Sequence, residues 1–220
     1  KYIIIMKSTK LKVLLSVIFV SWFLIGCNTR NQKNVNYPEK KIKWELNKNG
    51  SFTVRVGKLR IKNCYPAING QSITPEKISL TKSKVGGSIY YELGQGVELA
   101  ITLSEDSNSL VLKSKFTGME KAPDYFCPLA QGLIEGADRF YKQGVGFAGP
   151  SGVFPIPASP ERIDKPGLFE EAFSYDSYIE SGIMDSTNNT LVFGAYDHKD
   201  YLQRFIIVKT ALEWLIVGKP

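Results

Sequence analysis

Few side chains in this 220-residue chain could act as a nucleophile, a general base or a metal ligand. His198 is the only histidine, and it lies in the polar run Asp197–Asp200, which is typical of a turn. A Ser-His-Asp or Cys-His catalytic set would need this residue, so we do not expect nucleophilic catalysis of that kind. The three cysteines lack the grouped spacing of a structural zinc site, and no metal or other cofactor is predicted.

Acidic residues gather in one part of the C-terminal half. Two carboxylates at one site could hydrolyse a glycosidic bond, one as the acid and the other as nucleophile or base. Sequence spacing alone does not place any pair at the separation that this chemistry needs, and solvated carboxylates on a β surface would give the same pattern. We therefore assign no catalytic residue among these side chains: Glu161, Asp164, Glu170, Glu171, Asp176, Glu180 and Asp185.

An aromatic group lies within the same region. Phe173, Tyr175 and Tyr178 surround the pair Asp176-Ser177. Aromatic rings stack on the apolar faces of sugars, so Tyr175, Asp176 and Tyr178 are candidate carbohydrate contacts. In a strand, Phe173 and Tyr175 would share one face and Tyr178 would lie on the other. Ordinary aromatic packing in a core or between strands is the alternative.

The N-terminal segment predicts export. Three closely spaced lysines precede the thirteen uncharged residues 13–25, a run too short for an ordinary transmembrane helix, which needs about 20 residues. The ending Leu24-Ile25-Gly26-Cys27 resembles a bacterial lipoprotein cleavage box, in which the cysteine sulfur receives a diacylglycerol, although Ile25 departs from the usual small residue. We predict that residues 1–27 are a signal peptide ending at the lipidated Cys27. An uncleaved signal anchor with an incidental cysteine is the alternative.

The charge of the chain limits its partners. The net charge of +7 falls to about +3 when the basic residues of the predicted signal are removed. No basic stripe interleaved with aromatic residues remains, so we do not expect nucleic-acid binding. The expected partners are membrane lipid, through Cys27, and carbohydrate. The expected location is a bacterial membrane, at the outer membrane or the cell surface.

The pattern along the chain predicts one β domain behind a tether. Residues 28–40 are polar and predict a flexible linker. From residue 41 apolar and polar residues alternate, with turn signals such as Asn49-Gly50 between the runs. Residues 122–166 hold seven prolines and six glycines, which predicts an ordered, irregular excursion without a long regular element. Roughly ten or more short strands predict an all-β domain over 41–220, a sandwich of two antiparallel sheets.

Two features leave alternatives open. Cys64 and Cys127 could form a disulfide in an exported chain, or both could be buried free thiols. The chain stops at Pro220 directly after an apolar strand, as a natural terminus, a premature stop and a split gene all would. Sugar specificity and oligomeric state are not predicted.

The C-terminal half resembles a known domain family. Ser174–Tyr178, Asn189–Tyr196 and Tyr201–Phe205 are similar to the last strands of the N-terminal β-supersandwich domain of α-galactosidase-like (melibiase-type) glycoside hydrolases. The glycine-rich, aromatic loop 144–154 is similar to the loop before those strands, although it lacks the tryptophan often found there. The resemblance covers 140–217 and implies a galactose-mutarotase-like β-supersandwich.

The resemblance also implies a role. The catalytic apparatus of that family is two aspartates on a following (β/α)8 barrel, a fold of about 250 residues. Those aspartates would lie beyond Pro220, so this chain is expected to be a non-catalytic accessory domain that is inactive alone. It would contact carbohydrate or pack against a barrel encoded separately. The alternatives are a stand-alone carbohydrate-binding surface lipoprotein, and a structural or adhesion lipoprotein.

Overall fold

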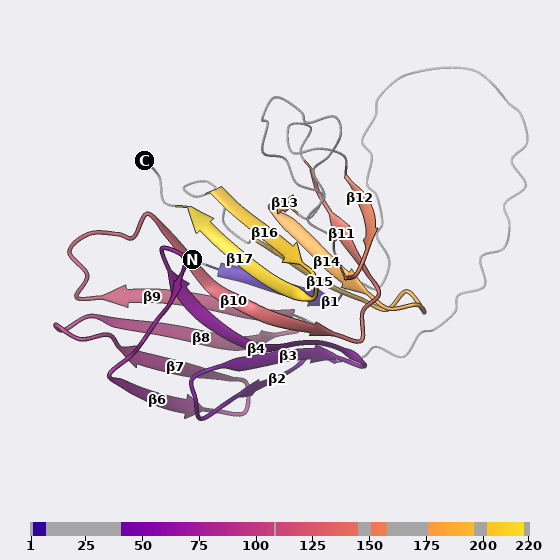
Figure 1. Cartoon of the computed structure of the whole chain (residues 1–220). Coiled ribbons are helices and arrows are strands. Elements are labelled where there is room, and N and C mark those ends of the chain that lie inside the picture. The colour runs from indigo at the N-terminus through magenta and orange to yellow at the C-terminus, as the bar shows by residue number, and fades with distance from the viewer. Residues whose placement is uncertain are drawn as a thin grey trace, which may run out of the picture.

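The computed structural model describes residues 2–7, 41–107, 109–144, 151–157, 176–195 and 202–217. Every regular element in these ranges is a β-strand, and they contain no helix that could cross a membrane. The strands form two antiparallel sheets that pack against each other (Figure 1). The expected all-β sandwich is therefore confirmed. Cys27 and the tether predicted over 28–40 lie outside the described residues.

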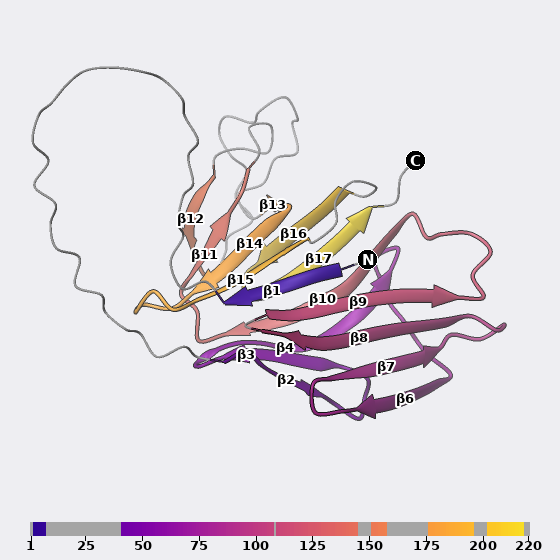
Figure 2. The same cartoon turned by 180° about the vertical axis from the view of Figure 1, so that it is seen from behind.

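The larger sheet has nine strands. Four of them, β6 to β9, form a meander of consecutive hairpins at one end, and β1 lies in the middle of the sheet (Figure 2). From edge to edge the order is β12 (Gly152–Pro155), β11 (Arg139–Lys142), β14 (Glu180–Met184), β15 (Thr190–Ala195), β1 (Tyr2–Lys7), β9 (Ser109–Thr117), β8 (Glu98–Asp106), β7 (Gly86–Glu92) and β6 (Lys77–Lys82).

The smaller sheet has eight strands. The short strand β5 (Gln71–Ser72) pairs with β4 outside the main path of the sheet. The main path runs β13 (Asp176–Tyr178), β16 (Leu202–Val208), β17 (Ala211–Val217), β10 (Tyr125–Glu135), β4 (Leu59–Ile68), β3 (Phe52–Val56) and β2 (Lys43–Leu46).

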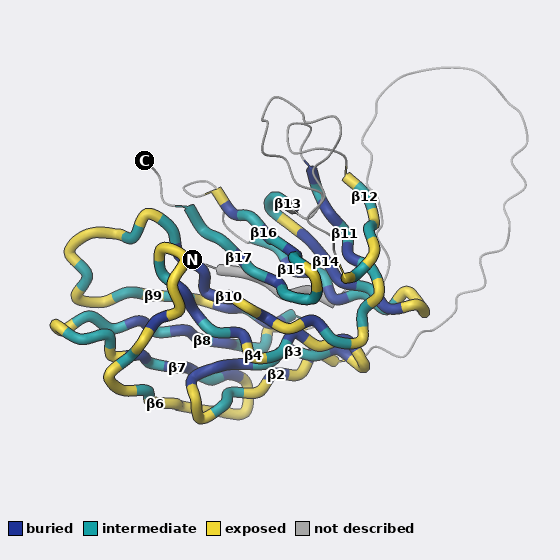
Figure 3. The backbone as a smooth tube through the Cα atoms, viewed as in Figure 1, coloured by how far each residue is buried: buried dark blue, intermediate teal, exposed yellow. Residues whose placement is uncertain are grey.

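Alternation of apolar and polar residues explains why many of these segments form strands with one buried face. In β8, Leu99, Ile101 and Leu103 are fully buried, whereas the residues between them are half-buried. In β3, Phe52 and Val54 are buried in the same alternating way. Figure 3 shows buried positions along strands of both sheets, and the buried side chains of the two sheets form one large apolar core. The strand pattern predicted from alternation is confirmed in these elements.

The predicted hairpin turn at Asn49-Gly50 is also confirmed, and it joins the two sheets. Gly50 has a φ of +82°, a conformation that favours glycine. Its carbonyl oxygen accepts a 2.5 Å hydrogen bond from the hydroxyl of Tyr91, a fully buried residue of β7 in the other sheet. The Tyr91 ring meets Tyr65 of β4 edge-on, with ring centroids 5.8 Å apart. These contacts hold the β2–β3 hairpin against the larger sheet.

The prediction of an irregular excursion over 122–166 was wrong for its first part. β10 runs without a break from Tyr125 to Glu135, and β11 follows it directly. The breakers in β10 are absorbed by β-bulges, because its register with β17 shifts between Phe126 and Leu129 and again between Leu129 and Gly132. Pro128 lies at the first shift, where a residue without an N–H group is tolerated.

Cys64 and Cys127 are free thiols rather than a disulfide. Cys127 pairs with Ala67 across the β10–β4 ladder, an odd number of residues from Cys64, so the two thiols belong to different faces of the sheet. Cys64 lies in the main core and Cys127 in a small separate cluster. Burial, with a smaller contribution from the charge of Glu213, raises the pKa of Cys127 to about 12. Both thiols are therefore protonated and unreactive near neutral pH.

Candidate functional site

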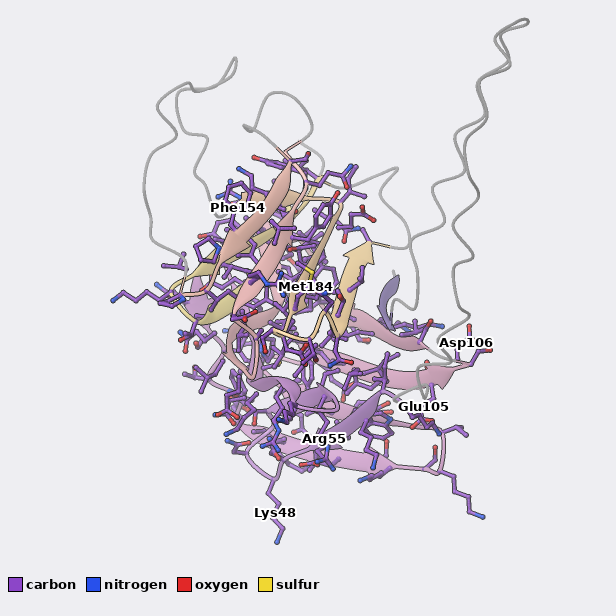
Figure 4. All side chains as sticks on the ribbon, turned by 90° about the vertical axis from the view of Figure 1, so that its right-hand side faces the viewer. Lys48, Arg55, Glu105, Asp106, Phe154 and Met184 are labelled. Atoms are coloured by element: carbon purple, nitrogen blue, oxygen red, sulfur yellow. The ribbon has the colours of Figure 1, made fainter. Side chains whose placement is uncertain are left out.

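Three turns meet at one end of the sandwich and enclose a pocket of about 430 Å³. The β3–β4 turn contributes Lys58, the β10–β11 turn contributes residues 136–138, and the β14–β15 turn contributes residues 185–187 and Asn189. These turns lie together on the right-hand side of Figure 1. Figure 4 views the molecule from that side, with Met184, the last residue of β14, near the centre. We refer to this cavity as the end pocket.

The turn between β10 and β11 can approach the turn between β3 and β4 because residue 136 is glycine. Gly136 has a φ of +75°, and a Cβ atom there would collide with the carbonyl oxygen of Lys58. On the other side of this turn, the N–H of Asp138 donates to the carbonyl oxygen of Met184 at 3.0 Å. The β10–β11 turn therefore lies close to both of the other turns of the end pocket.

The carboxylate of Asp185 organises the β14–β15 turn. Its Oδ1 accepts hydrogen bonds from the N–H and the hydroxyl of Thr187, at 2.9 and 2.8 Å, and from the N–H of Asn189 at 2.9 Å. Its Oδ2 accepts from the side-chain amide of Asn189 at 2.7 Å. Burial opposes ionisation, but these bonds outweigh it and lower the pKa of Asp185. Asp185 is thus an ionised anchor of the turn and is poorly suited to donate a proton.

Arg139 of β11 ties the same turn to its neighbours. Its Nη2 donates to the carbonyl oxygen of Asp185 at 2.7 Å and to Oδ1 of Asn188 at 3.1 Å. Its Nε donates to Oδ1 of Asp138 at 3.2 Å. This arrangement leaves the rim of the end pocket rich in fixed polar groups, and the pocket itself is open to solvent.

The described side chains around the end pocket offer ammonium, carboxylate, hydroxyl and amide groups, and none of them is an aromatic ring. Most binding sites for drug-like molecules are lined mainly by apolar side chains, so this composition is better matched to a small ligand rich in hydroxyl groups. Such a ligand could accept a hydrogen bond from the ammonium group of Lys58, whereas the donors of Thr187 and Asn189 are engaged by Asp185. The described residues contain no group of three or more metal-ligating side chains.

Among the residues predicted from the sequence as carbohydrate contacts, the described side chain of Tyr178 does not line the end pocket. Tyr175 lies outside the described residues. Asp176 and Tyr178 belong to β13, where they pair with Ile206 and Arg204 at the edge of the smaller sheet. Tyr178 is half-buried, and Ser177 between them is buried, with its hydroxyl bonded to the backbone of Glu180 at 2.5 Å. The grouping of the three predicted contacts stays a prediction.

Sequence reasoning found only part of the end pocket. Asp185 stood among the acidic candidates, and Asn188-Asn189 carries a turn signal. The contribution of Arg139 was missed, because its hydrogen bonds reach 46 and 49 residues along the chain. The pairing of β11 with β14 brings Arg139 close to the β14–β15 turn, and no local pattern in the sequence predicts this pairing.

Comparison with known proteins does not place the chain in a family. No family model matches it, and no curated protein or solved structure matches it. The geometry of the described residues and the sequence resemblance therefore carry the functional argument together.

Proposed function

We propose that this chain is an exported, lipid-anchored, non-catalytic accessory domain of an α-galactosidase-like glycoside hydrolase, with the ability to contact carbohydrate. The resemblance of 140–217 to the β-supersandwich of that family is the starting point. A two-sheet antiparallel sandwich is the fold which that resemblance requires. The partners proposed are membrane lipid at Cys27, carbohydrate, and a catalytic barrel encoded separately.

The observation that carries the non-catalytic part of the proposal is the state of Asp185. A glycosidase needs a carboxylic acid whose raised pKa keeps its proton near neutral pH, beside a second carboxylate. Asp185 has the opposite character, because four hydrogen bonds stabilise its charged form. Its position at the wall of the end pocket suits it to hold the shape of the β14–β15 turn that a bound sugar would meet.

An activity assay and a binding assay on the same purified chain test this proposal. The chain should release no nitrophenol from p-nitrophenyl α-D-galactoside, and it should bind melibiose weakly in calorimetric titration. Hydrolysis by the chain alone, abolished by a substitution in the chain, would contradict the accessory role. Lys58→Ala should weaken binding, whereas Lys48→Ala, at the β2–β3 turn labelled in Figure 4, should leave it unchanged.

A second candidate is a stand-alone carbohydrate-binding surface lipoprotein, and the open polar character of the end pocket favours it. The two candidates differ in what they need. A stand-alone binder should show its full sugar affinity by itself, whereas an accessory domain should gain affinity or activity when the barrel is added. A structural or adhesion lipoprotein remains the third candidate, and it should show no saturable sugar binding at all.

A further inference from the structure

In the larger sheet, the strand position between β9 and β15 is filled by β1, a segment that is far from both strands in sequence. β9 and β15 flank it and both pair antiparallel with β1, so β9 and β15 run parallel to each other. In the shared register Leu110 of β9 and Phe193 of β15 both pair with Ile5. Neighbouring strands are about 4.8 Å apart, so β9 and β15 are about 10 Å apart and cannot hydrogen-bond directly. We call this position the acceptor slot.

The acceptor slot lies over the apolar core. Four side chains from the flanking strands, Leu110, Leu112, Leu191 and Phe193, are at most 2% exposed with β1 in place. Leu112 and Phe193 also border a space of about 10 Å³ together with Trp214 of the opposite sheet. That space is at the lower limit for one water molecule, and its lining is apolar, so it offers no polar partners to hold one. A strand in the slot therefore closes a dry core as well as a sheet.

Removal of β1 from the acceptor slot would destabilise the larger sheet. Without β1 the sheet would separate into two four-stranded parts, β12-β11-β14-β15 and β9-β8-β7-β6. Each part would present a row of unpaired N–H and C=O groups beside buried apolar side chains. Such a pair of edges is an efficient template for another extended segment.

The covalent connection of β1 to the rest of the chain contributes little to holding it in the acceptor slot. Its partners β9 and β15 are far away in sequence, and the next described strand, β2, lies at the edge of the other sheet. The connection from β1 to β2 is a long loop, and closing it has an entropic cost that the pairing of β1 has to offset. The pairing on both sides of β1 must therefore provide most of its binding.

We propose that the acceptor slot is a strand-binding site whose ligand is the segment Tyr2–Lys7, held on both sides by antiparallel pairing as a separable strand. The slot recognises a short apolar segment that enters antiparallel to both β9 and β15. Cutting the chain between this segment and the sandwich leaves the strand bound without a covalent link. The inference does not depend on the proposed glycan-related function, since it follows from sheet pairing alone.

Cleavage of the folded full chain tests this inference. A specific protease site is inserted directly after Cys27, and the protein is purified in mild detergent, cut and passed through gel filtration. The N-terminal fragment should elute with the sandwich, and an excess of a synthetic peptide of residues 1–8 should displace it. The same peptide with Ile4→Pro should displace it about tenfold less effectively, because proline removes a ladder hydrogen bond.

The full chain carrying Ile4→Pro is the matched control, because it keeps the apolar run 13–25 that binds detergent. Its fragment should separate from the sandwich after the cut. Hydrogen exchange gives an independent measurement: backbone amides of β9 and β15 should stay protected in the cut protein and lose protection in the variant. Separation of the unaltered fragment with no change in exchange would overturn the proposal. Dimerisation of the cut sandwich with those amides still protected would also overturn it, by assigning the slot to a second copy of the chain.

Discussion

The carboxylate of Asp185 accepts four hydrogen bonds from Thr187 and Asn189, the residues that shape the turn after it. Bonds of this kind fix the shape of the β14–β15 turn at the wall of the end pocket. At the scale of single residues, Asp185 is therefore a structural anchor with an indirect role in binding.

Replacement of Asp185 with alanine should lower the free energy of unfolding by about 1–3 kcal/mol, because four part-buried hydrogen bonds from Thr187 and Asn189 lose their acceptor. Urea denaturation followed by circular dichroism measures the change. Asp106→Asn is the control, since Asp106 is exposed and lies at the β8–β9 turn, apart from Met184 in Figure 4. Equal effects of the two substitutions would contradict the anchoring role.

Acid should remove the stabilisation that Asp185 provides. Burial disfavours its charged form, yet the hydrogen bonds from Asn189 and Thr187 lower its pKa below the ordinary value of 3.8. A group with a lowered folded-state pKa stabilises the fold fully above its ordinary pKa and loses that effect as pH falls through the folded-state pKa. The difference in unfolding free energy between the unaltered protein and Asp185→Ala should shrink below about pH 4. A difference that stays constant down to pH 2 would refute the pKa argument.

The hydroxyl of Tyr91 provides a second test at this scale. Tyr91→Phe leaves the carbonyl oxygen of Gly50 without its buried 2.5 Å partner and should cost about 1–2 kcal/mol of stability. Tyr90→Phe is the control, because Tyr90 lies on the other face of the same strand and is only half-buried. Thermal denaturation of the two variants measures the difference, and equal melting temperatures would rule out the proposed link between sheets.

At the scale of elements, alternation made many strands predictable. β3 and β8 bury every second residue, so a period of two identifies both the strand and its buried face. β14 could not be found in this way, because Ser181, Gly182 and Ile183 are buried in succession and leave no alternating pattern. β10 was not predicted for another reason. Pro128 and Gly132 usually end a strand, but β-bulges let β10 continue through both residues.

Gly136 allows a test of the turn that closes the end pocket. Gly136→Ala combines a positive φ with a collision against the carbonyl oxygen of Lys58, whereas Gly96→Ala meets a similar φ of +76° with no atom within 4 Å. Both changes carry the strain of a left-handed alanine, about 1 kcal/mol, so the excess loss of stability in Gly136→Ala isolates the collision. We expect that excess to be measurable in urea denaturation. Equal destabilisation would show that the two turns approach less closely than described.

At the scale of the whole molecule, composition and periodicity predicted two antiparallel sheets, and that prediction is confirmed. The order of strands within each sheet was beyond such reasoning. β4 pairs with β10 and β1 with both β9 and β15, and these partners are selected by contacts far apart in sequence. The end pocket depends on the same long-range pairing. The sequence therefore indicated some of its residues one by one, but it could not predict that they lie together.

The separation of Cys64 from Cys127 follows from this architecture. Both thiols should resist alkylation in the native protein, because burial raises their pKa, and both should react after denaturation. Mass spectrometry after alkylation without reductant measures this directly. Recovery of a peptide pair linked by a Cys64–Cys127 disulfide would contradict the assignment of the two residues to different faces of the sheet.

The central claim is that the sandwich contacts carbohydrate at its end pocket without hydrolysing it. Titration of the isotope-labelled chain with melibiose, followed by two-dimensional NMR of the backbone amides, tests this claim most directly. We predict saturable shifts confined to Lys58, residues 136–139 and residues 185–189, with melibiose intact at the end of the titration. Release of galactose, or saturable shifts confined to another part of the molecule, would contradict the account.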